Sequence, residues 1–324
     1  MDLQNYTPFP ALLMRFGATE DVMGGSLVAR VTYDLLDGAL VQASEQSWIV
    51  SPKPWECEYG PMESDEVFYK GGTDLFLFGS AQAPRGRPVY EMTLSIEVGT
   101  FRRDILVLGD RAWIPRVKGV AMTDPQPFVT MPLTMDRAYG GKSEWDGLEV
   151  PFADNPNGRG FCLELEQAIG QRLPNLENPL ARIARWDDRP APVGVGICSQ
   201  AHSGRLAAGV TFGKGGAMKK IHPRLFNAAF PEMVVVGGVQ PGAAVRLTGF
   251  KPDGPITFVV PEVPVVFRLT LGTQATVRTP QIDQIGIEAD KQRVFITYRY
   301  PFRYVLYARQ RRTAELWPAP TAKA

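Results

Sequence analysis

Apolar and polar residues alternate along several short stretches of the chain, and this alternation predicts β-strands. Over residues 93–98, Leu94, Ile96 and Val98 fall on one face, and the polar residues between them fall on the other. A period of two is what a half-buried strand requires. The segment Arg103–Leu108 follows after a glycine, so the two segments together predict a hairpin.

A second hairpin is predicted further along the chain, where Ile282–Ile287 and Arg293–Tyr298 flank the dipeptide Asp290-Lys291. The strand-like segment Leu27–Tyr33 is followed by Asp37-Gly38, a pair that favours a tight hairpin turn. Other strand-like segments are Leu75–Gly79, Met233–Val236, Ala244–Phe250, Ile256–Val260 and Val263–Leu271.

Helix signals are few, and the centre of the chain is irregular. Residues 161–171 and 223–229 could each form a short helix, whereas residues 115–229 as a whole are rich in Pro and Gly. The pattern predicts a mainly β protein of antiparallel sheets in sandwich- or barrel-like units, with an irregular Pro/Gly-rich centre. Residues 1–312 are expected to form a single unit, or two packed β subdomains (about 1–114 and 230–312) joined by the centre at 115–229. The remaining residues, 313–324, are expected to form a loose tail.

Charge and composition point away from nucleic acid and membranes. The chain has 35 Lys and Arg against 34 Asp and Glu, so it lacks the concentration of positive charge that phosphate binding needs. Its densest basic cluster, Arg309, Arg311 and Arg312, fits a solvated end of the chain. No basic and apolar leader and no apolar run of about 20 residues is visible, so we expect neither a signal peptide nor membrane insertion. Three widely spaced cysteines favour the reducing cytoplasm.

No motif meets the spacing of a known catalytic or cofactor site. Residues 140–143 (Gly-Gly-Lys-Ser) resemble the end of a phosphate-binding loop, but Asp136 stands where that motif needs its first glycine. Cys198, His202 and His222 are too few and too irregularly spaced to predict zinc. We therefore expect a binding protein without metal or cofactor rather than an enzyme. A pair of carboxylates acting as a hydrolase remains an alternative.

Several polar and aromatic residues lie in tight glycine and proline contexts. An Arg side chain can tie loops together, because its fork of donors can hold carboxylates or several backbone carbonyls. Arg111, Arg137 and Arg159 are therefore interpreted as clamps that hold the irregular centre onto the sheets; the alternative is an interface with a partner. The full set of candidate residues is Asp110, Arg111, Trp113, Arg137, Tyr139, Asn155 and Arg159.

The order of these motifs along the chain resembles that of one family. The shared segments are residues 6–11, 71–74, 79–81, 109–113, 131–133, 136–141, 155–160, 173–175, 226–229, 282–283 and 298–299. Together they are similar to domain-of-unknown-function family 2169, which is found with bacterial type VI secretion systems.

The resemblance implies a cytosolic chaperone or adaptor. Such a protein would bind a secreted toxin effector and help to load it onto the spike, either the valine-glycine-repeat protein or its PAAR-type tip. It implies protein partners and no catalytic residues, and makes a small-molecule ligand unexpected. A structural or assembly component of the secretion machine that never contacts an effector is the other role that the resemblance leaves open.

Overall fold

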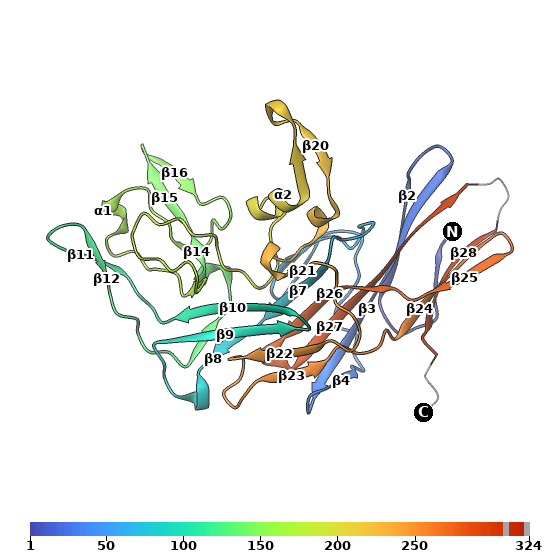
Figure 1. The fold of residues 1–324 in the computed structure, drawn as a ribbon, viewed down its shortest axis with the longest axis horizontal. Coiled ribbons are helices and arrows are strands. Elements are labelled where there is room, and N and C mark those ends of the chain that lie inside the picture. The colour runs from blue at the N-terminus through green and yellow to red at the C-terminus, as the bar shows by residue number, and fades with distance from the viewer. Residues whose placement is uncertain (307–310, 321–324) are drawn as a thin grey trace.

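Three large sheets organise the computed structural model, which describes residues 1–306 and 311–320. The protein is mainly β and mostly antiparallel, as predicted (Figure 1). The largest sheet has the order β2-β3-β27-β26-β7-β21, with β4 also paired to β3. Its strands are β2 (Ala11–Gly17), β3 (Val22–Leu36), β4 (Ala39–Gln42), β7 (Thr73–Phe78), β21 (Val234–Val235), β26 (Gln281–Glu288) and β27 (Arg293–Val305).

The other two large sheets have five and four strands. None of the three closes on itself in the described ranges, since each has two edge strands. The five-stranded sheet contains, in spatial order, β18 (Leu176–Glu177), β10 (Phe101–Leu108), β9 (Glu91–Val98), β22 (Ala244–Thr248) and β23 (Ile256–Val259). The four-stranded sheet contains β1 (Leu3–Asn5), β28 (Arg312–Pro318), β24 (Val265–Leu271) and β25 (Gln274–Arg278).

Short ladders and helices fill the connections. The two-stranded ladders are β5 (Trp55–Cys57) with β6 (Gly60–Met62), β8 (Ser80–Gln82) with β13 (Thr130–Pro132), β11 (Trp113–Pro115) with β12 (Val120–Met122), β14 (Tyr139–Gly140) with β17 (Arg159–Gly160), β15 (Lys142–Trp145) with β16 (Leu148–Pro151), and β19 (Val210–Phe212) with β20 (Met218–Ile221). The helices are α1 (Leu165–Ala168) and α2 (Ser203–Gly209), and the 3₁₀ turns are η1 (Pro84–Gly86), η2 (Met135–Arg137), η3 (Lys214–Gly216), η4 (Pro223–Phe226), η5 (Pro231–Met233) and η6 (Ala289–Lys291). Among the described residues, no helix has the length and apolar character needed to cross a membrane.

Both predicted hairpins are confirmed. Strand β9 pairs antiparallel with β10, and β26 pairs antiparallel with β27. The Asp37-Gly38 turn joins β3 to β4, and both of its residues have positive φ, 50° and 83°. A two-residue turn of this kind matches the twist of its strands, which explains the Asp-Gly pair.

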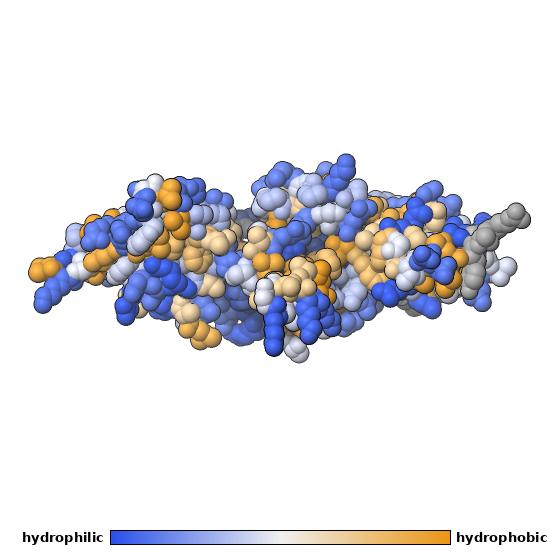
Figure 2. All heavy atoms as spheres, turned by 90° about the horizontal axis from the view of Figure 1, so that it is seen from above, coloured by the Kyte–Doolittle hydropathy of each residue, from blue (hydrophilic) through white to orange (hydrophobic). Residues whose placement is uncertain are grey.

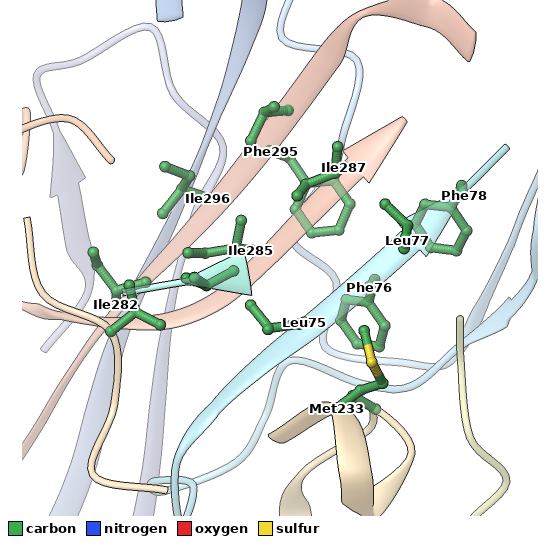
Figure 3. Close-up of a cluster of buried hydrophobic side chains, with 14 of the residues drawn as sticks. Leu75, Phe76, Leu77, Phe78, Met233, Ile282, Ile285, Ile287, Phe295 and Ile296 are labelled. Atoms are coloured by element: carbon green, nitrogen blue, oxygen red, sulfur yellow. The ribbon is translucent and has the colours of Figure 1, made fainter. Parts of the chain in front are cut away.

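The two faces of the large sheet are buried differently. On the inner face, Leu27, Val31 and Ile296 join the buried side chains of the five-stranded sheet in one continuous core. On the outer face, residues 43–72 cover the strands, and Trp48 packs against Phe295 with ring centroids 4.1 Å apart. Figure 3 shows side chains of β7, β26 and β27 packing on these faces, with Met233 of η5 reaching toward β7.

Residues 110–190, apart from β13 and β18, which pair with β8 and β10, form a lobe that we call the central lobe. It lies at one end of the molecule, beyond the five-stranded sheet (Figure 1). Its strands have two to four residues, and it has a small apolar core of its own. That core is built from Trp113, Tyr139, Phe161, Cys162, Ala168, Leu173 and Ile183.

The expected loose tail over 313–324 is wrong for residues 313–318, which belong to β28. Ala314 and Leu316 are fully buried there, and β28 pairs with both β1 and β24. Only two apolar positions of this short segment, Ala314 and Leu316, alternate with polar ones, which is too few to predict a strand from the sequence. Residues 321–324 and Arg309 lie outside the described residues. The helix expected over 161–171 is reduced to the single turn α1.

Candidate binding site

The seven candidate residues all lie in the central lobe, where several of them meet at one side chain that the sequence analysis did not single out. Asn175 is fully buried. Its amide nitrogen donates to the carbonyl of Leu108 and to Asp110 Oδ1, at 2.9 and 3.0 Å. Its amide oxygen accepts from Arg137 and Arg159 at 3.2 and 3.3 Å. The signal was present in the motif Leu173-Pro174-Asn175, because a buried Asn beside a proline turn commonly satisfies nearby backbone groups.

Arg111 is the most deeply buried of the candidate arginines. Its Nη2 donates to the carbonyl of Pro174 at 2.9 Å and to the Glu177 carboxylate. Glu177 belongs to β18 at the edge of the five-stranded sheet, so Arg111 ties the lobe to that sheet. These are the contacts that the clamp interpretation of Arg111 predicts.

Arg137 and Arg159 are half-buried, with side chains 27% and 17% exposed. Arg159 donates to the backbone carbonyl of Asp136 at 2.6 Å and to its carboxylate at 3.1 Å. Burial lowers the pKa of Arg159, and the nearby Arg137 charge acts in the same direction. Asn155 donates from its amide to the carbonyls of Met135 and Tyr139, at 2.8 and 3.0 Å.

Residues 140–143, which resemble the end of a phosphate-binding loop, are explained by backbone packing. Gly140 has φ 145°, and a Cβ there would collide with the backbone carbonyl of Asn155. Tyr139, one residue earlier, is buried in the lobe core and donates its hydroxyl to the carbonyl of Asp188 at 3.0 Å. Burial raises the pKa of Tyr139 to about 12. Glycine is therefore required at position 140, because the backbone of Asn155 lies too close to leave room for a side chain.

A groove of about 820 Å³ lies between the central lobe and the large sheet. One side is the β5–β6 ladder with the end of β7, and the other is the lobe segment 133–135 with Asn157. Residues 196–200 complete it. Its apolar lining is Pro54, Tyr59, Pro61, Met62, Leu77, Phe78, Leu133, Met135 and Ile197.

The groove has a wall of stacked aromatic rings and a buried thiol. Tyr59 stacks on Phe78 with ring centroids 4.2 Å apart, and its hydroxyl donates to Glu288 at 2.9 Å. Burial, followed by the hydrogen bond to Glu288, raises the pKa of Tyr59 to about 12. Burial also raises the pKa of Cys198 to about 12, so both groups are protonated at neutral pH. A protonated thiol is a poor nucleophile.

Two of the acidic residues at the groove, Glu58 and Glu63, are paired with basic side chains. Both terminal nitrogens of Arg205 donate hydrogen bonds to the carboxylate of Glu63, and the Arg205 side chain is buried. Glu58 pairs with Lys291, which also contacts Glu288. A fork-to-fork Arg–carboxylate pair fixes geometry strongly, so Arg205 of α2 holds the β5–β6 side of the groove in place.

A family model described as "Uncharacterized protein conserved in bacteria (DUF2169)" matches residues 21–299. The chain belongs to this family. No curated protein and no solved structure matches it. The DUF2169 match begins at the turn before β3 and ends within β27, so it includes the central lobe and the groove.

The DUF2169 chain also carries a buried polar row that the sequence analysis missed. Arg30, Thr297, Gln284 and Asp74 are register neighbours across β3, β27, β26 and β7. Arg30 is fully buried and donates to Thr297 Oγ1 at 2.8 Å, to Gln284 Oε1 at 2.9 Å and to Asp65 at 2.7 Å. The signal was an Arg inside the apolar run 27–33, since an Arg is seldom fully buried unless it is paired.

The metal-ligand candidates are not gathered together in the described ranges. His202 accepts from the backbone N–H of Gly204 at 3.1 Å, at the start of α2. His222 instead contacts Thr211 Oγ1 at 2.9 Å, and Cys162 lies in the lobe core. Among the described residues, no group of three or more His, Cys, Asp or Glu side chains is placed to hold a metal ion.

Proposed function

We propose that this DUF2169 protein is a bacterial chaperone or adaptor that binds a secreted effector in the groove. It would act in the cytoplasm and help to load the effector onto the spike of a type VI secretion system, through the valine-glycine-repeat or PAAR-type protein. The observation that carries the proposal is the groove of about 820 Å³ with a largely apolar lining. A chaperone covers apolar surface of its partner, so it needs an apolar receiving surface of its own.

The construction of the groove supports an extended polypeptide as its occupant. Its walls come from the large sheet and the central lobe, and boundaries of this kind commonly hold ligands. Strand β6, whose Pro61 and Met62 line the groove, pairs with β5 and, among the described strands, with no other. A bound segment could therefore add a strand to this ladder while its apolar side chains enter the groove.

The proposal is tested by substituting groove residues that are partly exposed. Met135→Asp and Ile197→Asp each place a carboxylate in the apolar lining. With the toxin encoded beside the gene as the partner, we expect each change to weaken binding about tenfold or more, the effect typical of a residue at the centre of an interface. Binding is measured by calorimetry on the purified proteins, and effector solubility by co-expression.

The matched control is Leu148→Asp, which makes the same change at a side chain that is 69% exposed on β16, outside the groove lining. It should leave binding unchanged. Circular dichroism of every variant shows whether the fold is kept. A toxin that stays soluble and is secreted equally well without this protein would show that the proposal is wrong, and retained spike binding in a strain without effectors would favour a purely structural role.

A further inference from the structure

A second cavity, of about 320 Å³, lies at the opposite end of β7 from the groove. The parallel pairing of β7 with β26 begins at Asp74 and Gln284, and just before it Thr73 Oγ1 donates to the carbonyl of Ile282 at 2.8 Å. A bulge leaves Asp283 without a register partner on β27. The glycine pairs 71–72 and 237–238 line the opening. The cavity therefore lies beside the point where the β7–β26 ladder begins.

Two acidic and two basic side chains meet beside this cavity, and one of the acidic groups is fully satisfied. Asp74 is fully buried and accepts from Lys70 Nζ at 2.7 Å and from Asn227 Nδ2 at 2.9 Å. It also accepts from the backbone N–H groups of Ala228 and Ala229, at 3.1 and 3.3 Å. Four donors leave this carboxylate little capacity for another.

Arg299 has a donor to spare. Its side chain is 3% exposed and lines the cavity. Its Nε donates to Asp283 Oδ2 at 3.0 Å, and its Nη1 donates to the carbonyls of Asp65 and Val67. Its Nη2 is buried and has no hydrogen-bond partner among the described residues. An unsatisfied buried donor destabilises the folded protein, so this nitrogen favours an added acceptor.

Lys70 has spare donors as well. Its side chain is 5% exposed and lies 3.9 Å from Asp283 Oδ2, which is too long for a hydrogen bond. Its contact with Asp74 uses one of the three N–H groups of the ammonium. Lys70 and Arg299 thus both keep buried donors beside the cavity, although the charges of Lys70, Arg299, Asp74 and Asp283 balance.

We propose that this cavity binds a carboxylate, which accepts hydrogen bonds from Arg299 Nη2 and Lys70 Nζ. A carboxylate offers about four acceptor sites, so it can accept from Arg299 Nη2 and from Lys70 Nζ at the same time. It carries one negative charge, whereas a phosphate group carries −1.5 to −2 and would be repelled more strongly by Asp283. The volume of about 320 Å³ is ample for a side chain or chain end that carries a carboxylate. This site is independent of the proposed groove, since it lies at the other end of β7.

The carboxylate could belong to a chain end, to an acidic side chain or to a free small acid, and three short peptides separate the first two sources. The probes are acetyl-Gly-Gly with a free carboxylate, the same peptide amidated, and amidated acetyl-Gly-Asp-Gly; acetate and inorganic phosphate are tested alongside at matched ionic strength. Binding is followed by calorimetry and by the NMR signal of the Arg299 Nε–H group in the wild-type protein. We expect a carboxylate-bearing probe to bind and to shift this signal, and the amidated Gly-Gly peptide to do neither.

Two variants test the donors and the charge of the site. Lys70→Met removes the ammonium but keeps most of the stem, and should weaken binding at least tenfold. Because that change could disturb Asp74, Gln281→Glu provides a second route: Gln281 is exposed at the cavity, and a negative charge there should weaken binding several-fold. Gln274→Glu, an identical change on the exposed strand β25, should have no effect.

Each outcome decides the proposal, and none depends on the effector. Binding of the free-carboxylate peptide alone identifies a chain end, and binding of the Asp peptide identifies an acidic side chain. Binding of acetate alone identifies a free small acid and would overturn the expectation that no small molecule binds. Binding of inorganic phosphate but of no carboxylate-bearing probe would overturn the proposal, and so would the absence of binding by every probe. The groove could fail its own test while this site passes, or the reverse.

Discussion

The large sheet and the central lobe both bury arginine side chains, but they use them in different ways. In the sheet, Arg30 lies among strands whose positions are already fixed by long backbone ladders, and β3 and β27 pair over thirteen residues. In the lobe, β14 and β17 pair over only two residues. Side chains such as Arg111 and Asn175 there make contacts that backbone ladders make elsewhere. We infer that the sheet is one cooperative unit and that the lobe depends on a few side-chain hydrogen bonds.

The largest effect is expected from removing the charge at the centre of the sheet. Arg30→Met leaves the buried Asp65 carboxylate without its arginine, so the free energy of unfolding should fall by about 3–5 kcal/mol. Urea denaturation followed by circular dichroism measures the change. Arg278→Met, at an exposed position of β25, is the matched control and should have little effect.

A double variant sharpens this prediction. In Arg30→Met with Asp65→Asn, no charge is left unpaired, so part of the lost stability should return. If the double variant is as unstable as the sum of the two single variants, the pair is not coupled and the sheet does not depend on it.

A somewhat smaller effect is expected from high pH, through two tyrosines in the sheet. The hydroxyls of Tyr33 on β3 and Tyr298 on β27 lie 3.0 Å apart. Burial raises the pKa of Tyr33 to about 12, although its hydrogen bond with Tyr298 acts in the opposite direction. Burial also raises the pKa of Tyr298, and the charge and hydrogen bond of Tyr33 raise it further.

The direction of the pH effect follows from the raised pKa. Below pH 10 the tyrosine is protonated in both states and the contribution is constant. Between pH 10 and 12 the unfolded chain releases the proton while the folded chain retains it, so stability falls by about 3 kcal/mol for Tyr33 as the pH rises. Urea denaturation at each pH should give a shallower decline for Tyr33→Phe than for the wild type. The stability of Tyr90→Phe, a change at an exposed side chain, should fall with pH as steeply as that of the wild type.

The sequence predicted the parts of the fold that depend on local pattern. Alternation identified the hairpin at residues 91–108, and Asp37-Gly38 identified a turn. Pattern could not reveal which segments meet. The pairing of β26 with β7 is parallel and joins residues more than 200 positions apart, and it places Asp74 beside Gln284. The groove and the cavity both depend on such long-range contacts, so local pattern could not show that their residues meet, although residues 71–74, 282–283 and 298–299 are among the segments that resemble the family.

The candidate residues of the lobe show the same limit on a smaller scale. The motifs correctly marked a region of tight turns, and Arg111 makes the kind of contacts expected of a clamp. Asn175 was not chosen, because its importance comes from four partners spread over residues 108–159. A side chain with partners on several loops, which we call a hub, can be recognised only from the three-dimensional arrangement of those loops.

The smallest of the three effects should come from this hub, and it should be local. Asn175→Ala leaves the buried carbonyl of Leu108 without one of its donors and frees Arg137 and Arg159, at a cost of about 1–3 kcal/mol. Because the lobe has its own small core, we expect faster amide hydrogen exchange and faster proteolysis within residues 110–190, with β3 and β27 unchanged.

The matched control for the hub is three residues away. Asn178 accepts one exposed hydrogen bond from the N–H of Leu180, so Asn178→Ala should leave exchange in the lobe almost unchanged. Equal acceleration of exchange in the lobe and in the large sheet after Asn175→Ala would mean that the two regions unfold as one. In that case the lobe would not be a separately stabilised body, and the difference between backbone ladders and side-chain ties would have no consequence for stability. Acceleration confined to the lobe would mean that one wall of the groove can open while the sheet that forms the other wall stays folded.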